Sequence, residues 1–184
     1  YAFSTENWNR PKLEVDALMT LLVSTLSKEI KTLDKNNVQL RAVGQLANLP
    51  KACFKELHDC IEYTKKNTGL VLTLALSYGG KEEILDAVRT IVKDCQNAKI
   101  NIENLDANLF SKYLYTADMP DPELMIRTSG EQRTSNFLLW QLAYAELYFT
   151  PVLWPDFRKK DFYEAIIDFQ QRERRFGKTG EQIK

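Results

Sequence analysis

Arg127, Arg133 and Ser135 lie close together in the sequence and could bind an anion. A guanidinium group forms paired hydrogen bonds with phosphate oxygens, and a hydroxyl can add a further donor. The apolar residues 124–126 before them are typical of a buried strand, while Ser135 and Asn136 are residue types that cap the N-terminus of a helix. We therefore predict a phosphate or diphosphate site in a loop between a strand and a helix.

A simpler interpretation of the same spacing is an ordinary surface loop whose arginines pair with Glu131 or Glu146. The order of strand, loop and helix favours the ligand site, because α/β proteins bind anions at the carboxyl ends of parallel strands and at helix N-termini. Spacing alone leaves both interpretations open.

Composition limits the class of protein. The 184 residues are 44% hydrophobic and 27% charged, which suits one domain with a sizeable core. Lys plus Arg and Asp plus Glu number 25 each, and this zero net charge argues against nucleic-acid binding through a basic face. Three cysteines without a C-x-x-C pair argue against a disulfide framework or a zinc site. His58, the only histidine, lies in a helical pattern beside Asp59, which favours a structural or exposed role and argues against a Ser-His-Asp triad. A single histidine also excludes a multi-histidine metal site.

Apolar periodicity predicts the elements that position the candidate residues. Apolar residues at spacings of three and four predict helices over residues 12–33, 50–66, 81–95, 107–114 and 160–176. Strands are expected to end near residues 3 and 126 and to occupy residues 38–44 and 70–76. The last of these is almost entirely apolar, as in a strand buried on both faces of a parallel sheet. Strands alternating with helices predict a single α/β domain over residues 1–184, with a mostly parallel sheet covered by helices.

A second polar loop, residues 4–10, also follows a strand, so a parallel sheet would place it at the same edge as residues 127–135. The sequence contains neither G-x-x-x-x-G-K-[ST] nor G-x-G-x-x-G. Any anion chemistry must therefore come from arginines, hydroxyls and helix ends.

Several segments together resemble one family. Residues 2–11, AFSTENWNRP, resemble the A-F-S-x-E-N-W-x-R-P motif of the cis-prenyltransferases. Residues 126–141 resemble that family's second signature, and residues 144–149, 154–157 and 172–177 continue it. The segments are long, follow in order and extend along the whole chain. The similarity is strongest to the bacterial undecaprenyl diphosphate synthases of the family.

The resemblance implies an activity. The family condenses isopentenyl diphosphate with an allylic diphosphate, here farnesyl diphosphate, and uses Mg²⁺. The implied product is a long-chain polyprenyl diphosphate, by similarity undecaprenyl diphosphate, a lipid carrier for the cell wall. A homodimer without a nucleic-acid partner is expected. The resemblance also implies a cytoplasmic location and contact with the inner face of the membrane through the lipid product.

The resemblance also implies roles for the second loop. Arg127, Arg133 and Ser135 match positions that hold the diphosphate of isopentenyl diphosphate, and Thr134 lies between them. Glu146 matches a position implicated in Mg²⁺ binding, which suits a hard cation shared by carboxylate and diphosphate oxygens.

In the first loop, Asn7 matches the position assigned to proton removal. Because an amide is a poor base, we expect Asn7 to orient the substrate while a diphosphate oxygen takes the proton. The remaining residues predicted to bind substrate in this loop are Ser4, Thr5, Glu6, Trp8 and Arg10.

Two further features follow from the resemblance. Arg175 and Gly177 match a tail motif that reaches the active site of the partner subunit. A hydrophobic tunnel between the sheet and two helices is expected to hold the growing chain, although each of its candidate residues would otherwise be assigned to an ordinary core. The candidates are Leu18, Leu22, Leu40, Leu70, Leu72 and Leu74.

The sequence departs from the family pattern in two ways. The family's amino-terminal segment D-G-N-G-R-W-A has no counterpart, so we expect a chain that lacks the first strand and the diphosphate loop and that is inactive alone. Gln132 stands where some relatives have a histidine near the metal, and no metal role is expected for it. The alternatives are a non-catalytic subunit that stabilises an active partner and a generic phosphate-binding α/β domain.

Overall fold

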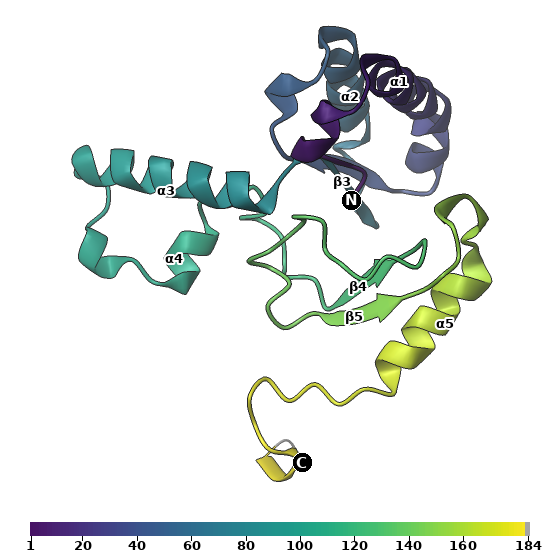
Figure 1. Cartoon of the computed structure of the whole chain (residues 1–184). Helices are drawn as coiled ribbons and strands as arrows, with labels where there is room; N and C mark the ends of the chain where they lie inside the picture. The colour runs from purple at the N-terminus through teal and green to yellow at the C-terminus, as the bar shows by residue number, and fades with distance from the viewer. Residues whose placement is uncertain (183–184) are drawn as a thin grey trace. The chain divides into compact units, whose positions relative to one another are not determined.

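The computed structural model describes residues 1–182. They divide into two compact units, Tyr1–Asp118 and a second unit that begins at Met119. Parallel strands and helices occur in both units (Figure 1), which confirms the predicted mixed α/β class. Within the described part of the chain, no helix combines the length and the apolar character needed to cross a membrane.

The first unit is built on a three-stranded parallel sheet. Its strands are β1 (Phe3–Ser4), β2 (Gln39–Val43) and β3 (Val71–Tyr78), in the order β1-β3-β2. Phe3 lies opposite Leu76, so β1 flanks only the carboxyl-terminal half of the central strand. The parallel pairing confirms the predicted sheet type and brings the carboxyl end of β1 beside that of β3.

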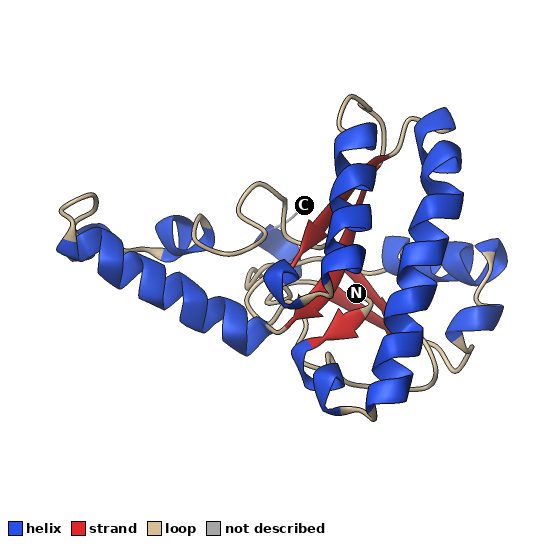
Figure 2. Cartoon of the chain, turned by 90° about the horizontal axis from the view of Figure 1, so that it is seen from above, coloured by secondary structure: helices blue, strands red, loops and turns tan. Residues whose placement is uncertain are grey.

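Two helices, α1 (Lys12–Lys35) and α2 (Lys51–Thr64), pack against each other and contact β2 (Figure 2). Each begins directly after a proline, whose fixed φ suits the start of a helix. The hydroxyl of Thr64 closes α2 by donating to the carbonyl of Cys60 at 2.9 Å and accepting the N–H of Leu40 at 3.0 Å. The core of the unit consists of Phe3, Val15, Met19, Leu26, Leu40, Leu49, Cys53, Leu57, Cys60 and Leu76.

The prediction that residues 70–76 are buried on both faces is wrong for the first half. Leu70 lies before the strand and is 70% exposed, and Leu72 is 39% exposed. The second half, from Ala75 to Tyr78, is buried. The difference follows from the short β1, which gives the first half of β3 a neighbouring strand on one side only.

The first unit continues with α3 (Gly80–Gln96) and α4 (Ala107–Ser111), the latter shorter than predicted. Glu83 on α3 is 1% exposed, and its carboxylate accepts the hydroxyl of Tyr78 and, at 2.8 Å, the backbone N–H of Tyr115. A buried carboxylate needs such donors to replace its lost hydration. These bonds tie the segment after α4 to the junction of β3 and α3.

The second unit contains a two-stranded parallel sheet of β4 (Leu124–Arg127) and β5 (Glu146–Phe149), and α5 (Lys159–Gln170) contacts β5. The sequence did not indicate β5. Helix α5 ends at Gln170 and not at residue 176 as predicted, because the arginines that follow turn back to acidic side chains of the same unit.

The helix predicted to begin at Ser135 and Asn136 is absent. Ser135, Asn136 and Leu138 have φ values of 50°, 62° and 50°, which lie in the left-handed region. A right-handed helix needs consecutive residues with negative φ, so this backbone cannot start one. The predicted contribution of a helix N-terminus to the anion site is therefore wrong.

Candidate functional site: two loops and a tail

Residues Thr5–Asn9 form a short 3-10 turn directly after β1. The backbone N–H of Ser4 donates to Oδ1 of Asn7 at 2.9 Å, which closes the turn on itself. Because Oδ1 accepts this bond, the Asn7 side chain has its Nδ2 group left to donate. At the end of the turn, the guanidinium of Arg10 pairs with Glu14 at 2.7 Å.

Trp8 fastens this turn to the sheet. Its indole Nε1–H donates to the hydroxyl of Ser77 at 2.9 Å, and its ring meets that of Phe3 edge-on at a centroid distance of 4.8 Å. Ser77 lies near the end of the central strand. The turn is therefore held by side-chain contacts to two strands of its own unit.

The second loop is held by its main chain. The N–H of Ser129 donates to the carbonyl of Val152 at 2.8 Å, and the N–H of Gly130 donates to the carbonyl of Thr150 at 2.9 Å. Both donors belong to left-handed residues, with φ of 68° and 70°. Arg127, the last residue of β4, is fixed by the bond from the Thr150 N–H to its carbonyl at 2.9 Å.

The side chain of Arg133 lies on the surface and pairs with Glu131 in the same loop. With 65% of the Arg133 side chain exposed, the pair is worth little energy, about 0–1 kcal/mol, so an incoming diphosphate can displace it. The simpler interpretation of the sequence, a surface loop whose arginine pairs with Glu131, therefore holds for Arg133. Such a pair does not exclude a ligand. Thr134 accepts the Phe137 N–H through its carbonyl at 3.1 Å, beside the left-handed Ser135.

Glu146, the predicted Mg²⁺ ligand, starts β5 and pairs with Arg172 at 3.0 Å. Arg172 also pairs with Asp168 at 2.5 Å and donates to the carbonyl of Leu147 at 3.0 Å. The hydrogen bond to Glu146 raises the pKa of Arg172.

Among residues 1–182, no three or more His, Cys, Asp or Glu side chains gather as a metal site would need. Proteins commonly hold Mg²⁺ with one or two carboxylates and the phosphates of the substrate. The donor chemistry of Glu146 fits one such ligand once the carboxylate exchanges Arg172 for the metal.

The tail, residues 172–177, contacts residues near the starts of β4 and β5. Arg174 pairs with Glu123, donates to the carbonyl of Tyr144 at 3.3 Å and places its guanidinium 4.7 Å from the ring centre of Phe176. Arg175 pairs with Glu173 at 2.7 Å. A pocket of about 160 Å³ is lined by Tyr144, Ala145, Glu146, Arg174, Arg175 and Phe176. Two predicted site residues, Glu146 and Arg175, thus line one pocket of the second unit.

Arg172 and Arg174 are functional candidates that sequence reasoning missed. Their acidic partners Glu146 and Glu123 lie 26 and 51 residues earlier, so no local spacing could reveal the pairs. The available signal was the clustering of arginines around Glu173 in a segment that resembles a family motif.

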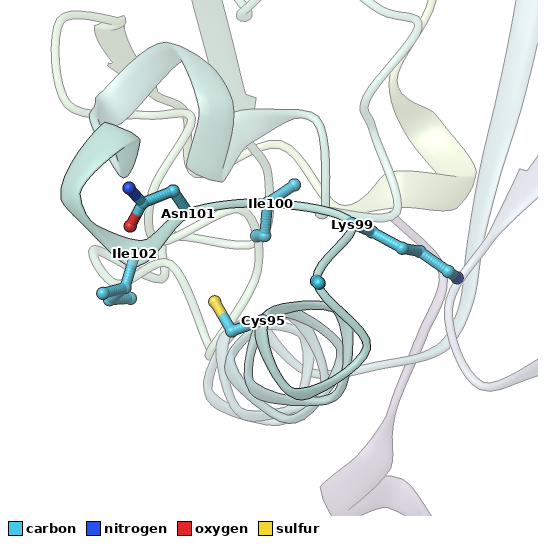
Figure 3. A pocket seen from close by; sticks show the side chains of 6 residues that line it. Cys95, Lys99, Ile100, Asn101 and Ile102 are labelled. Carbon is cyan, nitrogen blue, oxygen red and sulfur yellow. The ribbon is translucent and has the colours of Figure 1, made fainter.

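A larger pocket, of about 410 Å³, lies where the chain leaves α3 and contains no predicted site residue (Figure 3). Lys99 at its rim pairs with Asp94 at 3.0 Å. Its lining residues are Cys95, Ala98, Lys99, Ile100, Asn101 and Ile102.

The tunnel candidates differ in their surroundings. Leu40 belongs to the buried core of the first unit, and Leu18, Leu22 and Leu74 pack against that core. Leu70 and Leu72 are exposed. The tunnel stays a prediction, as does the meeting of the two loops at one sheet edge, because the first loop belongs to the first unit and the second loop to the second.

Comparison with known proteins identifies the family. The family model described as putative undecaprenyl diphosphate synthase matches residues 1–177. An isoprenyl transferase of Clostridium tetani is 54% identical over 177 residues, which are 96% of this chain and 69% of the relative. One from Chlorobaculum tepidum is 52% identical over 184 residues, which are 100% of this chain and 69% of the relative.

Solved structures agree. Lavandulyl diphosphate synthase from Lavandula x intermedia, crystallised in complex with dimethylallyl diphosphate, matches with a TM-score of 0.94 and 36% identity over 96% of this chain and 77% of that one. A probable undecaprenyl diphosphate synthase from Campylobacter jejuni matches with a TM-score of 0.84 and 39% identity over 96% of this chain and 81% of that one. The chain therefore belongs to the cis-prenyltransferases, the family of the isoprenyl transferases, and is a prenyl-transferring enzyme.

Proposed function

We propose that this protein elongates a prenyl chain by repeated condensation of isopentenyl diphosphate with an allylic diphosphate, starting from farnesyl diphosphate. The observation that carries the proposal is the likeness, over 96% of the chain, to a prenyl diphosphate synthase that holds an allylic diphosphate. The proposed product is undecaprenyl diphosphate, a lipid carrier for the cell wall. The match to the undecaprenyl diphosphate synthase model over residues 1–177 supports this product class.

The second loop is proposed to hold isopentenyl diphosphate. Arg133 has a guanidinium at the surface that pairs with Glu131, and Arg127 stands where β4 ends. Planar guanidinium forks match diphosphate oxygens two at a time, and the hydroxyls of Thr134 and Ser135 would add single donors. Because main-chain bonds fix the loop, its backbone needs little ordering before the arginines bind.

In the first loop, Asn7 is proposed to orient the substrate as a donor. Its Oδ1 already accepts the Ser4 N–H, so the Nδ2 group is the part of the amide that can reach a diphosphate oxygen. The proton released in the condensation then passes to a diphosphate oxygen and not to Asn7. Arg10, held by Glu14 at the surface, is proposed to add a second positive charge to this loop.

Mg²⁺ is the proposed cofactor, with Glu146 as one protein ligand. When bound, the ion neutralises charge on the diphosphate that leaves the allylic substrate. A Glu146 carboxylate that held the metal would give up its pair with Arg172, and Arg172 would keep Asp168 as a partner.

A homodimer is proposed in which Arg175 and Gly177 reach the partner's site. Gly177 has a φ of 81°, and an added Cβ would meet no atom within 4 Å. The positive φ, and not a lack of space, therefore favours glycine at this bend of the tail. The protein is proposed to work in the cytoplasm at the inner face of the membrane, because its product is a long apolar chain.

The test is incubation of the intact gene product with farnesyl diphosphate, labelled isopentenyl diphosphate and Mg²⁺. We expect labelled polyprenyl diphosphate that butanol extracts, and chromatography then gives its length. Omitting farnesyl diphosphate, or chelating the metal, should abolish the label. Complete absence of product would overturn the proposal and favour a non-catalytic subunit.

A further inference from the structure

The end of β3 touches the Thr5–Asn9 turn at two points. The hydroxyl of Ser77 accepts the indole N–H of Trp8 at 2.9 Å. At Gly79, a Cβ would lie 2.0 Å from Oε2 of Glu82 and 2.5 Å from Oγ1 of Thr5, so side chains of α3 and of the turn together fill the space beside this backbone. We propose that Ser77 and Gly79 are positioning residues that form a seat for the turn, and that Trp8 acts as its anchor.

The seat is rigid on its own side. Ser77 is completely buried and has a φ of 47°, a left-handed conformation that a serine holds only where its surroundings fix it. Its carbonyl accepts the N–H of Gln45 at 3.0 Å. The next residue, Tyr78, donates its hydroxyl to the buried Glu83. Neighbours on both sides therefore hold the seat in place without any help from the turn.

Trp8, the anchor, has one polar group, the indole N–H. An indole N–H is a donor only, and Ser77 supplies its acceptor. The Phe3 ring, edge-on at 4.8 Å, limits tilting of the indole. Trp8 is directly bonded along the chain to Asn7, so a fixed indole also fixes the amide that we propose contacts substrate.

The inference rests on the proposed function, in which Asn7 and Arg10 contact the diphosphate substrates. It deepens that function by assigning Trp8 a role in positioning the turn through its bond to Ser77, in addition to the substrate contact predicted for it. Ser77 and Gly79 act through Trp8 and Thr5, so neither is a catalytic residue.

The first experiment observes the indole directly and needs no activity. The intact gene product is labelled with ¹⁵N-tryptophan, and the Trp8 indole N–H signal is identified by its loss in Trp8→Phe. We expect Ser77→Ala to shift this signal upfield and speed its exchange with water. Ser77→Asn should restore it, because asparagine tolerates a left-handed backbone and its Oδ1 can accept the bond.

Thr64→Val is the matched control, since it also deletes a buried hydroxyl of the same unit, one that bonds to Leu40 and Cys60. It should lower the melting temperature and leave the Trp8 signal unchanged. An unchanged Trp8 signal in Ser77→Ala would overturn the seat, as would an equal change in Thr64→Val.

The second experiment is a double-mutant cycle. Ser77→Ala and Trp8→Phe should each lower kcat/KM by about tenfold, and the double variant should lose no more than either alone, because both break one interaction. Losses that multiply to about a hundredfold would overturn the positioning role. If the unaltered protein transfers no prenyl group, the proposed function fails, and the indole signal still decides whether the seat exists.

Discussion

The two candidate loops are fixed by opposite means. The Thr5–Asn9 turn depends on side chains, through the bond from Trp8 to Ser77 and the bond from the Ser4 N–H to Asn7. The second loop depends on main-chain bonds to residues 150–152, while its proposed ligand Arg133 extends to the surface. Single substitutions can therefore loosen the first loop, whereas in the second they should remove ligand contacts and leave the loop in place.

The largest effect is expected from Asn7→Asp. The carboxylate can still accept the Ser4 N–H, so the turn should persist, but the Nδ2 donor is lost and a negative charge faces the diphosphate. We expect kcat to fall about a hundredfold, as when one preorganised donor is removed. Steady-state kinetics measure the change, and Asn7→Ala, which also loses the acceptor, is the comparison. Equal or higher activity in Asn7→Asp would show that the position acts as a base.

Arg133→Ala tests the other side of the comparison. Losing one charge-assisted contact should weaken isopentenyl diphosphate binding by about 1.5–3 kcal/mol. The KM for isopentenyl diphosphate should rise accordingly, with the melting temperature unchanged, because the pair with Glu131 is exposed. Arg158→Ala, which also truncates an exposed arginine of the second unit and removes no proposed ligand contact, is the matched control. A KM equal to that of the unaltered protein would count against the assigned contact.

Arg172→Gln should have a smaller effect, on the free energy of unfolding and on the Mg²⁺ concentration that gives half-maximal rate. The pair with Glu146 is about a quarter to a third exposed on both sides, and breaking it should cost about 1–2 kcal/mol, measured by urea unfolding. If Arg172 competes with Mg²⁺ for this carboxylate, the variant should need a few-fold less Mg²⁺ for half-maximal rate. Binding of Mn²⁺, followed by its paramagnetic resonance, checks the competition without turnover. Unchanged metal affinity would mean that Glu146 is no ligand.

The smallest effect concerns the polar network beneath the first loop's seat. Asp86 accepts the hydroxyl of Tyr115 at 2.5 Å, and this bond lowers the pKa of Asp86. A lowered carboxyl pKa stabilises the fold above the unfolded value, about 3.9, and the contribution is lost as the pH falls through the folded value. Tyr115→Phe should therefore cost about 1 kcal/mol at pH 7 and progressively less in acid. Urea unfolding at several pH values measures this difference, and a constant loss at all pH values would contradict the linkage.

Much of the helical scaffold could be predicted. Apolar spacing, with Pro11 and Pro50 as starting signals, located α1 and α2 to within a few residues, and α3 agreed equally well. Such patterns are local, because the residues that form one face of a helix lie three or four positions apart in the sequence.

What could not be predicted depends on distant partners. Trp8 and Ser77 are 69 residues apart, and Glu146 and Arg172 are 26 apart, so no local sequence pattern predicts either bond. Ser135 and Asn136 were misassigned because good capping residues are also residues that tolerate the left-handed backbone seen there. The residue types of both loops were recognisable in the sequence, and the means by which each loop is fixed was not.

The parallel pairing of β1 with β3 has a consequence for the order of synthesis. Phe3 pairs with Leu76, so β1 leaves the ribosome long before β3, its partner strand among the described residues, exists. At usual translation rates the wait is on the order of ten seconds, during which α1 and α2 can form. The motif-bearing first loop must therefore stay unassembled until β3 arrives, and chaperones that shield nascent apolar segments have that interval in which to act.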